Sequence, residues 1–192
     1  MRIGVLAAQG AFIEHVNLLC RLGVEAFPVR LPREMKKLDG LIIPGGESTT
    51  ISRFLKEDNL AGEIKKLAGE GLPVFGTCAG TILLASEIAD GNRVESLGLM
   101  NIRVKRNAFG RQKESFEADV SVPALGNKKF PGVFIRAPLI EAVMDGEILA
   151  RLDDGTIVAA RQGKFLASAF HPELTDDPRF HRYFLDIIKG QS

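Results

Sequence analysis

The sequence predicts an α/β protein of three layers, with a mostly parallel sheet between two layers of helices and a small antiparallel extension. Two patterns indicate this fold class. In the first half of the 192 residues, short apolar runs alternate with helix-like segments. Strands that are apolar on both faces and separated by helices are typical of a parallel sheet buried between helical layers. From about residue 97 onward, strand-like runs follow one another, and turn signals join the last of them.

The first half contains alternating expected strands and helices. The expected strands are Ile3–Ala8, Ala26–Arg30, Leu41–Ile43 and Pro73–Gly76, and the expected helices are Ala11–Leu22, Ser48–Leu55, Leu60–Ala68 and Thr81–Ala85. Gly23 suits the end of the first helix, and Ser48 suits the N-cap of the second. Because ligand sites of such sheets lie at the carboxyl ends of the strands, we expect the turn 44–46 and Cys78 to lie together.

The second half is expected to be rich in strands. These strands are Leu99–Val104, Phe116–Val120, Val133–Ile135, Ile148–Arg151, Ile157–Ala160 and Phe165–Ala167. The turn signals Asp154-Gly155 and Gln162-Gly163 predict that the last three form hairpins, and a helix is expected over Pro178–Lys189. There is no repeat or linker, so we expect a single domain over residues 1–192.

Composition limits the possible partners and compartment. A hydrophobic content of 45% with 26% charged residues is ordinary for a globular protein, and a net charge of +1 gives no support for nucleic acid or an anionic membrane as partner. No apolar run approaches the roughly 20 residues that span a bilayer, and no signal peptide is expected. Two cysteines, Cys20 and Cys78, do not make a disulfide framework, which favours the cytoplasm. Cys20 is expected on the buried face of the first helix.

Cys78 stands between two glycines in Gly76-Thr77-Cys78-Ala79-Gly80, after an apolar strand and before an expected helix. This is the layout of a nucleophile elbow, in which glycines leave room for a strained backbone. The turn places the thiol at the start of a helix, where backbone N–H groups favour the thiolate. A cysteine after a strand is, by itself, more often a small core residue, so the interpretation depends on its partners.

A histidine and a carboxylate near the other end of the chain supply those partners. His171 and Glu173 follow a strand-like run and are separated by one proline. A thiol nucleophile needs a base to take its proton and a carboxylate to orient the imidazole. His-Pro-Glu by itself is commonly a surface turn, but together with the elbow it predicts a cysteine hydrolase.

Acyl transfer also needs donors for the developing oxyanion. The N–H of Ala79, directly after the nucleophile, is one expected donor, and Gly46 in the Pro44-Gly45-Gly46 turn is another. The alternative is that this turn only leads the chain into the next helix, and both interpretations can hold at once.

Three segments together resemble the signatures of the class I, triad-type glutamine amidotransferases. They are Pro44-Gly45-Gly46-Glu47-Ser48, Gly76-Thr77-Cys78-Ala79-Gly80 and Phe170-His171-Pro172-Glu173. More closely, the chain resembles the glutaminase subunits of pyridoxal 5′-phosphate synthase. The further matches cover nearly the full length and are Ala8-Gln9-Gly10, Glu47–Thr50, Arg106–Gln112, Ser115–Asp119, Phe134–Pro138 and Glu173–Thr175. Thr81 and Ala8 depart from the usual larger residues, and neither is a catalytic group.

The resemblance implies a flavodoxin-like α/β fold and the hydrolysis of L-glutamine to L-glutamate and ammonia by Cys78, His171 and Glu173. It implies a hetero-oligomer with a synthase subunit, which uses the ammonia to build pyridoxal 5′-phosphate. It also implies a set of glutamine-binding residues: Gly46, Glu47, Ser48, Arg106, Ile135 and Arg136. The planar guanidinium of arginine suits the carboxylate of a free amino acid, although a solvated charge at a strand end is an equal alternative without the resemblance. No cofactor is expected, and the three histidines are not spaced as metal ligands.

Four other functions fit parts of this sequence less well. A glutaminase serving another synthase, for nucleotides or histidine, would share the triad, and only the segments around Arg106 and Arg136 discriminate. A hydrolase or stress protein of the related elbow fold typically takes its acidic group from elsewhere. An inactive scaffold subunit is disfavoured by the intact triad. A flavodoxin-like cofactor module would need a glycine-rich phosphate loop that the first strand end lacks.

Overall fold

The computed structural model of this chain describes residues 1–57, 59–89, 94–106 and 115–191. The first half alternates strands and helices in the order β1 (Arg2–Leu6), α1 (Phe12–Arg21), β2 (Glu25–Val29), η1 (Pro32–Met35), β3 (Gly40–Ile43), α2 (Ser48–Glu57), α3 (Leu60–Gly69), β4 (Val74–Thr77) and α4 (Ala79–Leu84). The second half continues with β5 (Ala85–Ile88), β6 (Met100–Lys105), β7 (Ser115–Val120), η2 (Pro123–Leu125), β8 (Phe130–Ile135), β9 (Leu139–Val143), β10 (Glu147–Arg151), β11 (Ile157–Gln162), β12 (Phe165–Ser168), η3 (Pro172–Leu174) and α5 (Arg179–Lys189).

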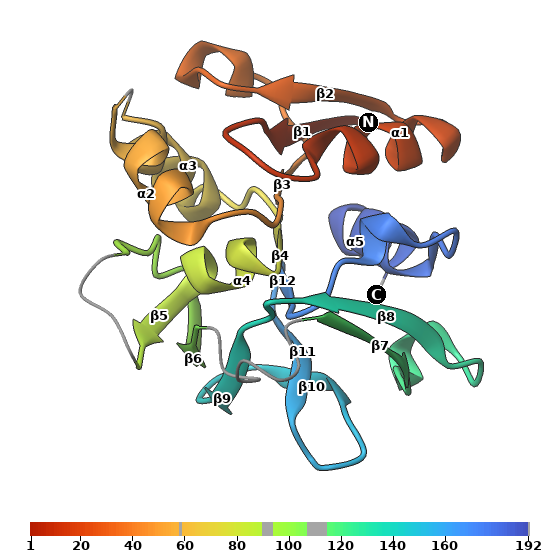
Figure 1. Ribbon diagram of the computed structural model, residues 1–192. Coiled ribbons are helices and arrows are strands. Elements are labelled where there is room, and N and C mark those ends of the chain that lie inside the picture. Colours follow the sequence, from red (N-terminus) through yellow and green to blue (C-terminus); the bar gives the residue numbers. More distant parts are fainter. Residues whose placement is uncertain (58, 90–93, 107–114, 192) are drawn as a thin grey trace.

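Within the described residues, ten strands form one sheet in the order β2-β1-β3-β4-β12-β11-β9-β6-β5, with β10 paired to β11 (Figure 1). The neighbours from β2 to β12 are parallel. The pairs β12–β11, β11–β9 and β9–β6 are antiparallel, and β7 and β8 form a separate antiparallel pair. The predicted fold class is confirmed, as are the hairpins β10–β11 and β11–β12.

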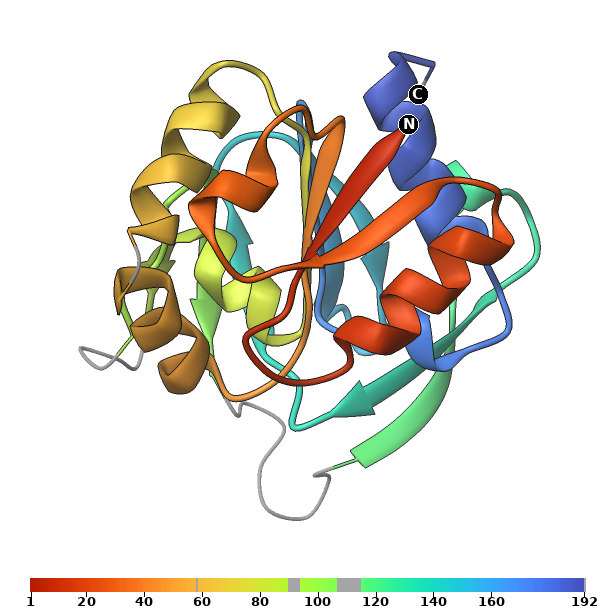
Figure 2. The ribbon, with the colours of Figure 1, turned by 90° about the horizontal axis from the view of Figure 1, so that it is seen from above.

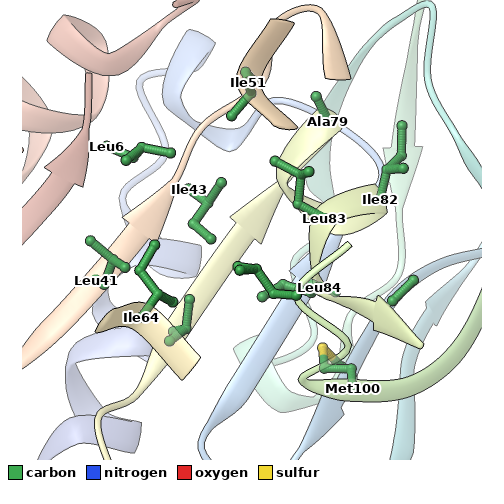
Figure 3. Close-up of a cluster of buried hydrophobic side chains, with 14 of the residues drawn as sticks. Leu6, Leu41, Ile43, Ile51, Ile64, Ala79, Ile82, Leu83, Leu84 and Met100 are labelled. Carbon is green, nitrogen blue, oxygen red and sulfur yellow. The ribbon is translucent and has the colours of Figure 1, made fainter. Parts of the chain in front are cut away.

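Helices cover both faces of the sheet. Figure 2 shows α2, α3 and α4 on one side and α1 and α5 on the other, with β7 and β8 beside the second group. Two buried clusters correspond to these two sides. Figure 3 shows the first cluster, in which α2, α3 and α4 pack on the strands through Leu6, Leu41, Ile43, Ile51, Ile64, Leu83 and Leu84.

The second cluster is rich in phenylalanine. Six phenylalanine rings in it are fully buried, namely Phe75, Phe130, Phe134, Phe170, Phe180 and Phe184. Phe75 of β4 stacks on Phe180 of α5 with ring centroids 6.2 Å apart, and Phe180 meets Phe170 edge to face at 5.2 Å. Such pairs contribute about 0.5–1.5 kcal/mol beyond their area burial. They hold α5 against the strands that carry the motifs.

Three local expectations differ from the structure. The sequence did not single out β5 or β9 as strands. The helix expected over Thr81–Ala85 ends at Leu84, and Ala85 is already the first residue of β5. Because no turn lies between α4 and β5, no turn signal marked the start of this strand. Cys20 was expected to be buried in α1, and this is wrong because its side chain is exposed. The buried face of α1 contains Leu18 and Leu19. Cys20 follows Leu19 and is rotated about 100° around the helix axis from it, which turns its side chain toward solvent.

In the part of the chain that the structure describes, no helix combines the length and the apolar character needed to cross a bilayer.

Candidate active site

The predicted nucleophile stands at the centre of the sheet. β4 lies between β3 and β12, both parallel to it, so the carboxyl ends of these three strands share one edge. These ends carry the turn 44–46, Cys78 and the segment 169–173. The topology therefore brings the three predicted motifs together, although they are far apart in the sequence.

Cys78 forms the expected elbow, but the strain lies on the cysteine itself. Its φ is +50°, directly before the first residue of α4, whereas Gly76 and Gly80 have no positive φ. A Cβ on Gly80 would lie 2.0 Å from the carbonyl oxygen of Ile43, and one on Gly76 would lie 2.6 Å from the Gly80 backbone. The two glycines therefore allow α4 to pack tightly on β3 and β4, and this packing holds the thiol in place.

His171 and Glu173 form the expected pair. The Nδ1 of His171 lies 2.7 Å from Oε1 of Glu173, and the backbone N–H of His171 donates to the carbonyl of Val133 at 2.8 Å. Burial lowers the pKa of His171, but hydrogen bonds with Cys78 and Glu173 and their charges outweigh burial and raise it to about 10. The imidazole of His171 is therefore protonated at neutral pH, which places a cation beside the thiol of Cys78.

A pocket of about 300 Å³ opens at this edge of the sheet, which is the lower end of the roughly 300–1,000 Å³ typical of small-molecule sites. The lining residues come from all three strand ends and from the loops beside them. They are Gln9, Gly10, Ala11, Gly45, Gly46, Glu47, Ser48, Cys78, Ala79, Ile82, Arg106, Ile135, Arg136, His171 and Leu174. Every predicted site residue lines the pocket except Glu173, which lies behind His171 and is buried.

Two lining residues, Ala11 and Ile82, were not singled out by the sequence, and a third, Leu174, was named only as part of the match 173–175. Ala11 precedes α1, Leu174 directly follows Glu173, and Ile82 lies four residues after Cys78 on α4. Residues four apart on a helix share a face, so spacing from the nucleophile was a usable signal for Ile82. Adjacency to the segment 8–10 was the only signal for Ala11.

The two predicted arginines reach the pocket from different strands. Arg106 follows β6 and is half-buried, and it is the one residue of the motif 106–112 that lies within the described ranges. Arg136 follows β8 and is exposed, with a φ of +43° that side-chain-bearing residues rarely adopt. Beside it, the carbonyl oxygen of Ile135 accepts a hydrogen bond from the Cys78 thiol at 3.7 Å. Two cationic side chains thus border the pocket near the thiol.

Glu47, not Ser48, caps α2, which corrects the expected N-cap. The carboxylate of Glu47 accepts hydrogen bonds from the N–H groups of Thr49 and Thr50, at 3.2 and 2.8 Å, and from both hydroxyls. These bonds, the Thr49 hydroxyl first, lower the pKa of Glu47 to about 2. Ser48 is the first helical residue and is buried against the pocket.

Two further histidines lie behind Glu173. His15 of α1 and His181 of α5 are completely buried, and Nε2 of His15 is 3.4 Å from Oε2 of Glu173. Neither histidine was predicted to have a role. Helix periodicity could have predicted that both are buried. Apolar residues follow each histidine three and four positions later, on the same face of the helix, and these residues are buried too.

Comparisons with known proteins agree with this geometry. The model of the SNO glutamine amidotransferase family matches residues 5–189. A pyridoxal 5′-phosphate synthase subunit PdxT of Herpetosiphon aurantiacus is 59% identical over 191 residues, which cover 97% of this chain and 100% of that protein. The same subunit of Pelotomaculum thermopropionicum is 58% identical over 195 residues, with 100% and 98% covered.

Solved structures give the same picture at the level of the fold. A glutamine amidotransferase of known structure has a TM-score of 0.92 at 52% identity and covers 97% of this chain and 98% of its own. A putative GMP synthase component from Thermoplasma acidophilum has a TM-score of 0.70 at 20% identity, with 99% and 94% covered. This second likeness concerns the fold alone.

Proposed function

This chain belongs to the SNO glutamine amidotransferase family, and we propose from this premise that it hydrolyses L-glutamine to L-glutamate and ammonia. In this proposal Cys78 is the nucleophile, His171 the general base and acid, and Glu173 the group that orients His171. The observation that carries it is the contact of His171 with both Cys78 and Glu173 at a pocket of small-molecule size. The pocket also contains two arginines for an amino-acid carboxylate.

The reaction follows from the positions of these groups. The Cys78 thiolate attacks the side-chain amide carbon of glutamine, and the oxyanion that forms accepts from the N–H groups of Ala79 and Gly46. Imidazolium at His171 gives its proton to the amide nitrogen, which leaves as ammonia, and a glutamyl thioester remains on Cys78. His171 then takes a proton from water, whose oxygen attacks the thioester, and glutamate and the free thiol are released.

We assign the rest of the glutamine molecule to the pocket walls. Arg106 and Arg136 take the α-carboxylate, and Gly46, Glu47, Ser48 and Ile135 enclose the rest of the molecule as further lining residues. The Glu47 carboxylate already accepts four hydrogen bonds at the start of α2. Within the described residues, its backbone carbonyl accepts only the N–H of Ile51, at 3.0 Å, and keeps a second lone pair for the α-ammonium group.

We propose further that the ammonia goes to a separate pyridoxal 5′-phosphate synthase subunit in a hetero-oligomer. Curated relatives at 52–59% identity over nearly the full chain are named as PdxT subunits of that synthase. A structural relative of another pathway, the putative GMP synthase component, is only 20% identical. An exposed Cys20 and a nucleophilic Cys78 suit a reducing compartment, so we place the complex in the cytoplasm, as one domain spanning residues 1–192.

Docking of the synthase subunit is proposed to complete the oxyanion hole. Gly10 and Gly46 have φ of +81° and +150°, and a Cβ on Gly10 would lie 1.9 Å from the carbonyl oxygen of Gly45. The turn of Gln9 and Gly10 and the turn of Gly45 and Gly46 therefore touch, so a partner that moves the first can rotate a peptide of the second. One missing oxyanion donor costs roughly 10²–10³-fold in turnover, which bounds the activation from this change.

The proposal is tested by glutamate release from glutamine, measured on the purified chain with and without the pyridoxal 5′-phosphate synthase subunit. We expect glutamate release that rises when the partner is added and disappears in Cys78→Ala. Cys20→Ser is the matched control, because that thiol is exposed and outside the pocket, and it keeps wild-type activity. Absence of glutaminase activity in the complex would overturn the function, and equal rates with and without the partner would overturn the coupling.

A further inference from the structure

Behind the triad lies a buried pair of histidines that the proposed mechanism does not use. His15 comes from α1 and His181 from α5, and neither side chain is exposed to solvent. Their rings are in contact, with Nδ1 of His15 2.8 Å from Nε2 of His181. In the described residues no group of three or more histidines, cysteines or carboxylates is placed to hold a metal ion. The contact is therefore a hydrogen bond between two imidazoles.

The other nitrogen of His15 is hydrogen-bonded to the hydroxyl of Thr77 and lies close to the carboxylate of Glu173. Its Nε2 is 3.4 Å from Oε2 of Glu173 and 3.3 Å from the hydroxyl oxygen of Thr77, the residue before the nucleophile. Oε2 of Glu173 forms no well-aligned hydrogen bond in the described part of the chain, while Oε1 is held by His171. A buried carboxylate oxygen without a donor is costly. Nε2 of His15 is placed to supply that donor, since bonds in catalytic sites often tighten when the substrate complex forms.

The hydrogen-bond geometry selects one pair of tautomers. If His15 carried its proton on Nδ1, a nitrogen lone pair would face the carboxylate of Glu173, and His181 would bury an unpaired N–H on Nδ1. If His15 carries the proton on Nε2 instead, it donates toward Glu173 and accepts from Nε2–H of His181. His181 Nδ1, which has no partner in the described residues, is then only an unused acceptor, and that is the cheaper of the two arrangements.

We propose that His15 is a positioning residue of the triad, in which an imidazole with its proton on Nε2 holds the second oxygen of Glu173 so that the first stays on His171. His181 fixes this tautomer from α5. The inference rests on the proposed function and adds to it a group that no motif contains. It means that α1 and α5, which do not line the thiol, set the geometry of the base.

Burial keeps His15 and His181 uncharged at neutral pH. Burial and the nearby His181 and His171 lower the pKa of His15 well below its usual value, and burial lowers the pKa of His181 to about 3. A neutral donor orients Glu173 without cancelling the negative charge that favours the imidazolium of His171. The groups that raise the pKa of His171 are Cys78 from the elbow and Glu173 from η3, and His15 adds no charge beside them.

Two amide variants separate positioning from packing. The side-chain nitrogen of glutamine lies as many bonds from Cα as Nε2 of histidine, and that of asparagine as many as Nδ1. His15→Gln therefore keeps a donor toward Glu173, whereas His15→Asn keeps only a group that faces His181. With the synthase subunit present, we expect His15→Asn to lose about 10- to 100-fold in kcat, the range for outer hydrogen bonds that orient catalytic groups. KM should change little, and His15→Gln should recover most of the loss.

The pH dependence of Cys78 alkylation gives a second readout that needs no glutamine turnover. In a Cys20→Ser background, iodoacetamide reports the pH at which the elbow thiol becomes reactive. Loss of the Glu173 orientation destabilises the thiolate–imidazolium pair, so the midpoint moves to higher pH in His15→Asn and stays near that of the parent in His15→Gln. Thermal unfolding of both variants checks that they are folded.

The outcomes are separable. Parent-like kcat and alkylation midpoint in a folded His15→Asn would overturn the inference and leave the glutaminase proposal standing. Equal losses in both variants at unchanged midpoint would also overturn it, since packing alone would then explain them. A parent enzyme without glutaminase activity, but with a midpoint that shifts only in His15→Asn, would overturn the proposed function and support the positioning role.

Discussion

Glu173 is buried and contributes to the site only through the imidazole it contacts, 2.7 Å away. Glu173→Gln keeps the shape and removes the charge, so a tautomer of His171 unsuited to catalysis becomes stable. By analogy with other triads, turnover should fall on the order of 10⁴-fold. Since the charge of Glu173 helps to raise the pKa of His171 to about 10, the alkaline limb of kcat/KM should move to lower pH. Asp176→Asn, an exposed change in the same segment, is the control, and wild-type turnover in Glu173→Gln would remove it from the triad.

Arg106 and Arg136 differ in exposure but border the same pocket. Truncating either to alanine removes a charge-assisted contact with the glutamine carboxylate, which is worth about 1.5–3 kcal/mol. We expect a loss of roughly one to two decades in kcat/KM for glutamine. Arg103→Ala is the matched control, because Arg103 pairs with Glu87 and Glu141 on the surface and such pairs contribute little. Unchanged kinetics of both pocket variants would contradict the assignment.

The turn after β3 is as important as the elbow after β4, because Gly45 makes room for the imidazole of His171, the proposed base. A Cβ on Gly45 would lie 2.3 Å from Cε1 of His171 and 3.3 Å from Cβ of Cys78. Gly45→Ala should therefore displace the imidazole and abolish most of the glutaminase activity while the fold remains. Gly69→Ala, at the end of α3 where a Cβ meets nothing within 4 Å, should leave activity intact. An active Gly45→Ala enzyme would show that His171 does not sit against this turn.

Glu47, the N-cap of α2, stabilises the folded chain by an amount that depends on pH. Its pKa is lowered to about 2 in the folded chain, so it stabilises the protein above the ordinary value of 4.5 and loses that effect as pH falls toward 2. Glu47→Ala should lower the free energy of unfolding by about 1 kcal/mol at neutral pH, and the difference should shrink below pH 4.5. Glu57→Ala, at the other end of α2, lacks a capping role and serves as control in denaturant titrations. A deficit that is constant down to pH 2 would contradict the assignment of Glu47 as the cap.

At the scale of the whole molecule, the strand–helix alternation predicted the sheet and both helical layers, and the paired motifs predicted which strand ends meet. The sequence missed β5 because no turn separates it from α4, and it missed the exposure of Cys20 because one residue of helix rotation decides it. It also missed His15 and His181, since these two histidines bond to each other across 166 residues of chain and His15 bonds to Thr77 across 62. Local patterns report periodicity and turns, whereas such contacts depend on how distant elements pack.

The central claim is that the elbow thiol of Cys78, with His171 and Glu173 behind it, attacks glutamine. Mass spectrometry of the complex with its synthase partner, following treatment with a glutamine-analogue electrophile, tests this claim most directly. We predict one adduct on the peptide that contains Cys78, slowed by added glutamine and lost in Glu173→Gln at neutral pH, with Cys20 unmodified. An adduct on Cys20 with Cys78 left free would contradict the account.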